Sequence, residues 1–260
     1  CIVVWISSSS AVIVAGYTIS AILILSSQMY FLRKVIPKEV SYNFYNNQWF
    51  KDMGKYSLPF VTWGFIAGVQ QNSARWALEY FQSTETVGYY AVLHQLGYAP
   101  IQIVSGMAMA FLMPIFFSRY GDGASKARNE TVGNLINKFV ILGTVLTISA
   151  TLFSIFFHSA IFKLFVNSSY FSASYLLPWV VCSGGIFSVG VICATQIMGL
   201  LKPNELIPAA VGSSVIGISA AILGVYYFSL IGAISSMLIH AIAYTFWVVM
   251  RLHKIKRNSK

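Results

Sequence analysis

Uncharged polar side chains and one arginine interrupt two apolar runs between residues 55 and 102. Gln71 and Arg75 are four residues apart, so a helix would place them on one face. A charge inside a bilayer costs roughly 2.5–3.5 kcal/mol and normally faces a bundle interior or a wet cavity. Arg75 is therefore a candidate partner for an anionic headgroup such as a phosphate. The alternative is an interfacial arginine that extends outward and pairs with Glu79.

A polar stripe follows in the next apolar run. It consists of His94, Gln95, Tyr98 and Gln102. A stripe of this kind points away from lipid, either toward neighbouring helices as hydrogen-bonding contacts or toward an aqueous cavity. Pro100 removes a helical hydrogen bond and Gly97 weakens the same turn, which predicts a kink or hinge there.

Other reactive side chains lack the spacing of a catalytic or metal site. The sequence holds no HExxH, GxSxG or Walker motif and no clustered carboxylate pair, and its 4 histidines are far apart along the chain. The 3 cysteines form no CxxC and fit buried apolar positions better than a disulfide framework or a metal site. We therefore expect no catalytic residue, no metal and no cofactor, and a protein that is not an enzyme.

Composition sets the fold class. Apolar residues make up 57% of the chain, charged residues 9%, and mean hydropathy is +0.70, whereas a soluble domain carries about a quarter charged residues. Only helices and closed barrels satisfy the backbone inside a bilayer, and the alternation of barrel strands is absent. The sequence predicts an all-α integral membrane protein. The net charge of the chain is +10, and its basic residues lie near the ends of the predicted spans. This placement indicates the membrane topology and contact with lipid headgroups, and we expect no nucleic-acid partner.

Hydropathy predicts seven transmembrane helices. They cover residues 11–32, 56–81, 87–117, 135–157, 175–199, 206–227 and 231–250. All of the 17 Lys and Arg residues except Arg75 and Lys163 fall on one side of the membrane in this arrangement of spans. Because basic residues gather on the cytoplasmic side, the pattern predicts a cytoplasmic C-terminus. Small residues that allow close helix approach are expected at two faces. They are Gly184, Gly185 and Gly190 in one span and Ser213, Gly217 and Ala221 in the next.

The domain organisation follows from these spans. Residues 1–32 are expected to end an N-terminal bundle, as a residual helix tail and one full span. Residues 33–55 form a cytoplasmic linker, 56–250 a six-helix C-terminal bundle, and 251–260 a basic cytoplasmic tail. Because the chain starts with Cys1 inside an apolar run, we expect a front part to be missing.

Three short motifs carry a resemblance to a known family. A basic residue precedes Ser57-Leu58-Pro59 at the start of a span, Arg75 lies near its outer end, and Thr86-Val87-Gly88-Tyr89-Tyr90 begins the next span. This pattern resembles the opening of the C-terminal half of the Wzx-type polysaccharide (O-antigen) flippases, in the multidrug/oligosaccharidyl-lipid/polysaccharide exporter superfamily. Family members resemble a pair of six-helix bundles with both termini cytoplasmic and a long linker between the halves.

The resemblance implies a function. The parent protein would move an undecaprenyl-pyrophosphate-linked oligosaccharide across the bacterial inner membrane by alternating access, for O-antigen and lipopolysaccharide biosynthesis. The resemblance also implies membrane lipids as partners and allows other polysaccharide-assembly proteins. The expected cavity-lining residues are Gln71, Arg75, His94, Gln95, Tyr98 and Gln102. A cation-coupled multidrug exporter of the same superfamily is the first alternative, and a membrane-embedded polysaccharide polymerase or ligase the second.

Overall fold

The computed structural model describes residues 10–35, 47–120, 126–200 and 203–258. The chain divides into two units, Cys1–Met53 and Gly54–Lys260. All regular structure in the described ranges is helical, which confirms the all-α prediction. The predicted helix tail before residue 10 and the middle of the predicted linker, residues 36–46, lie outside the described residues.

The first unit contains α1 (Ser10–Val35), and α2 (Asn47–Phe81) begins in it and continues into the second unit. The hydropathic stretch of α1 is exposed on every side within the described chain. A helix that is apolar all round and unburied in water is unstable, whereas hydrocarbon covers such a surface without cost. The composition of α1 therefore fits a membrane span.

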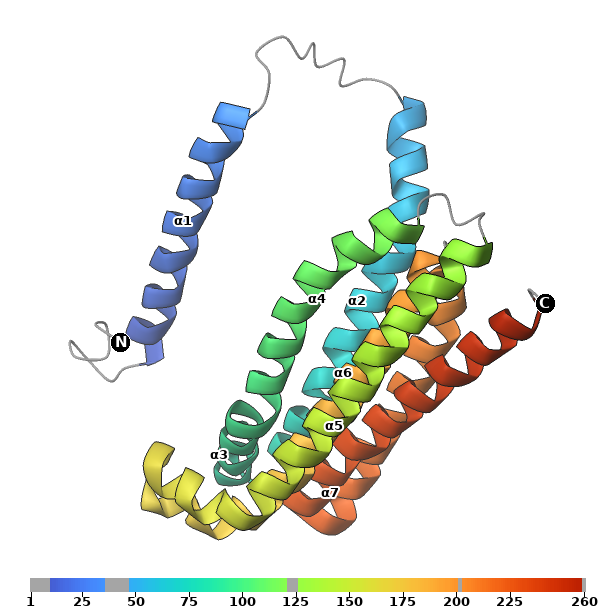
Figure 1. The fold of residues 1–260 in the computed structure, drawn as a ribbon. Coiled ribbons are helices and arrows are strands. Elements are labelled where there is room, and N and C mark those ends of the chain that lie inside the picture. Colours follow the sequence, from blue (N-terminus) through green and yellow to red (C-terminus); the bar gives the residue numbers. More distant parts are fainter. Residues whose placement is uncertain (1–9, 36–46, 121–125, 201–202, 259–260) are drawn as a thin grey trace. The chain divides into compact units, whose positions relative to one another are not determined.

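The second unit is a bundle of long helices (Figure 1). Its elements after α2 are α3 (Thr84–Leu93), a π-helical turn η2 (His94–Tyr98), α4 (Ala99–Tyr120), α5 (Lys126–Phe165), η3 (Ser168–Leu176), α6 (Leu177–Gly199), η4 (Pro203–Leu206) and α7 (Ile207–Asn258). The Ser83 side chain accepts a hydrogen bond from the Thr86 amide and so caps the start of α3. Helix α6 packs against α4, α5 and α7.

The central place of α6 depends on its small residues, as the sequence predicted. Gly184 lies against the ring of Tyr98, where a Cβ on the glycine would be 3.3 Å from Tyr98 Cδ2. A Cβ on Gly185 would overlap the Thr147 side chain of α5. Because these two adjacent glycines meet two different helices, the small face lets several neighbours approach α6 at once.

Helix α7 reverses direction at Ser229, whose backbone is not helical (φ 50°, ψ −127°). Gly224 and Gly232 then face each other, so that a Cβ on Gly224 would lie 2.9 Å from the Gly232 carbonyl oxygen. Farther from the turn, a Cβ on Gly217 would lie 2.9 Å from Cβ of His240. Helix α7 is thus an antiparallel helical hairpin, and its turn falls between the predicted spans 206–227 and 231–250.

Several helices are long and apolar enough to cross a membrane. In the described ranges these are Val14–Val35, Thr84–Phe116, Thr131–Phe165, Ser168–Gly199 and Asn204–Ile255. The last range contains the reversal at Ser229 and so corresponds to two of the predicted spans. The predicted span 56–81 in α2 is only partly described, and its described part is not among these helices. The number of seven spans stays a prediction.

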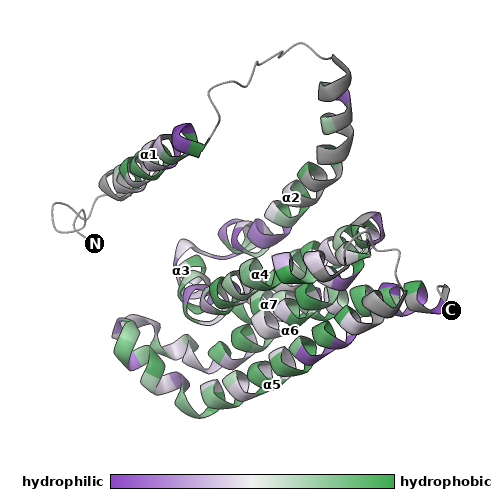
Figure 2. Ribbon diagram, turned by 45° about the horizontal axis from the view of Figure 1, so that its top comes forward, coloured by the Kyte–Doolittle hydropathy of each residue, from purple (hydrophilic) through white to green (hydrophobic). Residues whose placement is uncertain are grey.

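Hydropathy and burial are arranged as in a membrane bundle. Hydrophobic colour covers most of α4, α5, α6 and α7, while hydrophilic residues gather at the last turns of α2 beside α3 (Figure 2). Large apolar side chains such as Ile141, Leu146 and Phe156 on α5 are exposed. Apolar patches of this extent are rare on soluble monomers. This surface is consistent with contact with lipid.

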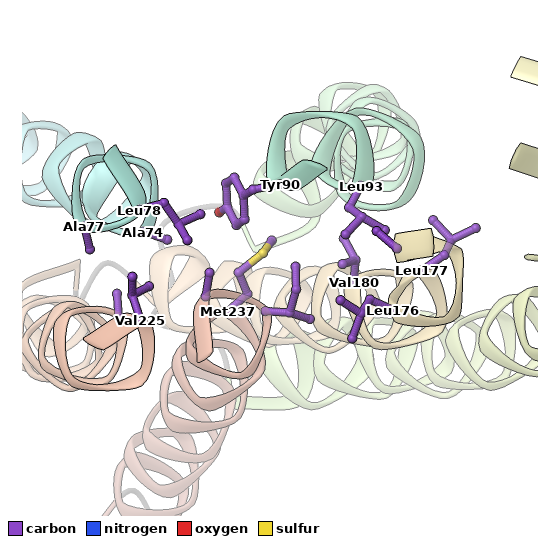
Figure 3. Close-up of a cluster of buried hydrophobic side chains, with 14 of the residues drawn as sticks. Ala74, Ala77, Leu78, Tyr90, Leu93, Leu176, Leu177, Val180, Val225 and Met237 are labelled. Atoms are coloured by element: carbon purple, nitrogen blue, oxygen red, sulfur yellow. The ribbon is translucent and has the colours of Figure 1, made fainter. Parts of the chain in front are cut away.

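The largest buried cluster joins α2 and α3 to α6 and α7. Tyr90 of α3 lies between Leu78 of α2 and Met237 of α7, and Leu93 points toward Val180 of α6 (Figure 3). All five side chains are at most 9% exposed. The cluster fixes the relative positions of these helices immediately beside the polar residues described next.

Candidate functional site

A small polar pocket lies between α2, the α3–η2 segment and the second half of α7. Its polar lining includes Gln70, Gln71, Ser73, His94, Tyr98 and His240. The open volume of this pocket is about 20 Å³, which is enough for roughly one water molecule. A polar pocket in an apolar bundle is the arrangement expected where a membrane protein handles a polar ligand.

Helical periodicity brings the α3–η2 side chains into one row. Tyr90, His94 and Tyr98 follow one another at four-residue steps, with ring centroids 6.0 Å apart for Tyr90 and His94 and 5.0 Å apart for His94 and Tyr98. Opposite this row, Ser236 and His240 of α7 are also four residues apart and line the same pocket. Each wall of the pocket is therefore one face of one helix.

The η2 turn lies where the sequence predicted a kink or hinge. The amide of Ala99 donates to the His94 carbonyl, which is five residues earlier, and this widens the helix just before Pro100. Gly97 is buried, and a Cβ there would lie 3.0 Å from Cγ1 of Val180 on α6. π-turns are rare and occur often at functional sites. Movement about Gly97 and Pro100 stays a prediction.

Arg75 is one helical turn after the pocket residue Gln71 and does not itself line the pocket. Its Nε is buried without a hydrogen-bond partner among the described residues. The predicted pairing with Glu79 is not formed, since the ion pair within the described ranges joins Arg251 and Glu205, and Glu79 instead accepts from Thr84 Oγ1 at 3.4 Å. Arg75 is partly buried and forms no ion pair within the described residues.

Arg75 lies on the same face of α2 as Gln71, which lines the pocket. Charge interactions are stronger in an apolar surrounding than in water. An anion that entered the pocket would therefore meet Arg75 as well as the hydrogen-bonding groups of the lining.

His240 is a pocket residue that the sequence reasoning missed. Its ring is 8% exposed and stacks on Phe187 of α6 with centroids 5.6 Å apart. The close approach of Gly217 leaves room for it on the other arm of the hairpin. The available signal was a histidine inside a long apolar run, which marks a functional candidate in a membrane span.

The predicted polar stripe does not act as one surface. His94 and Tyr98 line the pocket, but Gln95 is exposed and is not part of the lining. Gln102 faces α6, where its Nε2 donates to the Gly184 carbonyl at 3.2 Å and to Ser188 Oγ at 3.3 Å. Gln102 therefore forms a hydrogen-bonding contact between helices, which is one of the two roles expected for the stripe.

No protein-family model, curated protein or solved structure matches the chain. The chemistry of the pocket is therefore the basis for assigning a function. Within the described residues, no group of three or more His, Cys, Asp or Glu side chains lies close enough to hold a metal ion. The lining offers amide, imidazole and phenol groups, which exchange hydrogen bonds with hydroxyl groups or water. Together with Arg75 they suit a ligand that carries both hydroxyl groups and negative charge.

We expect Gln102→Leu to lower the free energy of unfolding by about 1 kcal/mol, because hydrogen bonds between membrane helices contribute about 0.6–2 kcal/mol each. Thermal unfolding in detergent measures this change, and Gln95→Leu, at an exposed position of the same stripe, is the matched control with little expected effect. A loss for Gln102→Leu no larger than that for Gln95→Leu would show that the Gln102 hydrogen bonds do not hold α4 against α6.

Proposed function

We propose that the chain forms the second half of a flippase that moves an undecaprenyl-pyrophosphate-linked oligosaccharide, such as an O-antigen unit, from the cytoplasmic to the periplasmic leaflet of the bacterial inner membrane. The supporting observation is a polar pocket in an otherwise apolar bundle, one helical turn from Arg75, which forms no ion pair within the described residues. In this proposal the chain has seven spans, six of them in the C-terminal bundle, and a cytoplasmic C-terminus. The charge pattern of the loops supports that orientation.

The chemistry of the cargo matches these groups. Sugar hydroxyl groups cannot cross hydrocarbon unaided because they would leave their hydrogen bonds unsatisfied. Gln71, His94 and Tyr98 supply donors and acceptors for them, and Arg75 supplies a cation for the pyrophosphate. The lipid tail remains outside the bundle, in contact with apolar helix surfaces.

The size of the pocket implies a change of shape during transport. With an open volume of about 20 Å³ it is too small for a sugar, so a sugar could enter only if α2, η2 and α7 moved apart. Opening requires one of these walls to move. The π-turn at η2, with Gly97 and Pro100, is the proposed hinge, since its hydrogen bonding is already irregular.

A multidrug exporter coupled to a cation would share the fold but needs an acidic residue deep in a span. In the described helices with described side chains, Glu79, Glu85 and Glu205 lie at helix ends. This distribution favours the flippase over the exporter.

The direct test measures leaflet transfer. The protein is reconstituted in vesicles with a fluorescent undecaprenyl-pyrophosphate-linked oligosaccharide, and a membrane-impermeant quencher reports how much label remains outside. We expect transfer at least about tenfold faster than in protein-free vesicles and slower transfer of an undecaprenyl lipid without sugars. Equal rates with and without protein, or efflux of cationic drugs in place of glycan transfer, would contradict the proposal.

A further inference from the structure

A second and larger hollow lies at the C-terminal end of α7, apart from the polar pocket. It has a volume of about 730 Å³ and is open to the surface. Binding sites for drug-sized molecules usually have about 300–1,000 Å³. Every described residue that lines it belongs to the final turns of α7, after the stretch that lines the polar pocket. We call it the α7 groove.

The α7 groove changes from apolar to cationic along the helix axis. One row of side chains runs from Phe246 through Met250 to Arg257, and the adjacent row runs from Trp247 to Lys254. Residues at three- and four-residue steps share a face of a helix, so each row is a continuous strip. Both strips have their apolar residues toward the bundle and their charges toward the C-terminal end.

The apolar half of the groove is exposed but rests on a rigid support. Phe246 is 62% exposed and Met250 is 46% exposed. Beside them, the Trp247 ring fills the space next to Gly212, where a Cβ would overlap it. Buried Leu252, on the same helix, belongs to the core cluster under the groove. A ligand at this surface would therefore meet a preformed apolar wall.

The cationic half keeps most of its charge. Arg251 pairs with Glu205 at 3.3 Å, which occupies one of the five N–H donors of the guanidinium. Lys254 and Arg257 are exposed, and within the described ranges neither forms an ion pair. His253 also lines this half, and its Nδ1 lies 2.9 Å from the Val249 carbonyl oxygen. The end of the groove is therefore positively charged.

We propose that the α7 groove binds one anionic phospholipid, with its phosphate beside Lys254 and Arg257 and an acyl chain along Phe246 and Met250. Charge complementarity and the apolar strip together support this ligand, because a lipid has both features in the same order. A free phosphate would leave the apolar half uncovered, and a zwitterionic lipid would bring no net charge to the cationic half. This inference does not depend on the proposed transport function.

The test measures lipid binding to the purified chain in a neutral detergent. Native mass spectrometry counts bound lipid while phosphatidylglycerol or phosphatidylcholine is titrated. We expect one phosphatidylglycerol per chain, bound about tenfold tighter than phosphatidylcholine. The double variant Lys254→Gln/Arg257→Gln should bind it roughly 25-fold more weakly, since each basic residue near an anionic surface contributes about fivefold.

Matched controls separate this site from general charge effects. The variant Lys138→Gln/Lys163→Gln removes two exposed charges from α5 and should bind as the wild type does, whereas Phe246→Ser should weaken binding about threefold or more. Glycerol 3-phosphate, which has the headgroup chemistry without acyl chains, should displace the lipid only at far higher concentration. Equal affinity for phosphatidylglycerol and phosphatidylcholine would overturn the proposal, as would glycerol 3-phosphate that competes as well as the lipid does. A loss of binding in the α5 control equal to that in the groove variant would also overturn it. So would a groove variant that changes the oligomeric state and leaves lipid binding intact.

Discussion

Replacing Gly232 with alanine is expected to destabilise the protein by at least about 3 kcal/mol. A Cβ at this position would overlap the Gly224 carbonyl oxygen in the other arm of the α7 hairpin. The obstacle is backbone, which cannot change rotamer, so the two arms would have to separate. Overpacking usually costs about 1–3 kcal/mol and more where the surroundings cannot relax. Thermal unfolding in detergent micelles measures the loss.

Gly106→Ala is the matched control for Gly232→Ala. Gly106 is exposed within α4, and no atom lies within 4 Å of its Cβ position. Alanine is preferred over glycine in a helix by about 1 kcal/mol, so this variant should be neutral or more stable than the wild type. The two substitutions are chemically identical and have opposite expected signs. Equal stability of both variants would show that the α7 hairpin does not close at Gly224 and Gly232.

The α7 hairpin was predictable because its signals are local. Two apolar runs, 206–227 and 231–250, are separated by only three residues, and the structure reverses between them at Ser229. The small face of Gly184 and Gly185 was also predictable, since small side chains in a membrane helix have few other uses. The lengths were less accurate. Helix α5 spans Lys126–Phe165, well beyond the predicted 135–157, because the polar residues before 135 and the mostly apolar residues after 157 both continue the helix.

The pocket was only partly predictable, because it depends on which helices become neighbours. His94 and Tyr98 share a helix face that four-residue spacing reveals in the sequence. His240 is far from them along the chain and joins them only when α7 folds back. Gln102 follows Tyr98 at the same spacing but bonds to Gly184 and Ser188 of α6 and does not line the pocket. Spacing alone could not show where along the shared helix face the pocket ends.

Replacing Arg75 with glutamine is expected to lower glycan transfer about 30-fold or more while the fold remains stable. Removing one partner of a charge pair in an apolar setting costs about 2–5 kcal/mol of binding. The fold should tolerate the change, because the described residues hold no ion pair to Arg75 and its Nε has no partner there. The quenching assay measures transfer, and thermal unfolding measures stability.

Two further variants decide what Arg75 does. Arg75→Lys keeps the charge without the planar donor group and should retain more transfer than Arg75→Gln. Lys163→Gln removes an exposed charge from the last turn of α5, outside the pocket, and should leave transfer unchanged. If the charge acts on the pyrophosphate, the defect of Arg75→Gln should also disappear for an uncharged polyprenyl lipid with the same sugars. Full transfer by Arg75→Gln at equal protein abundance would mean that Arg75 only anchors the helix at the membrane interface, and that the pocket recognises its ligand through the hydrogen bonds of Gln71, His94 and Tyr98.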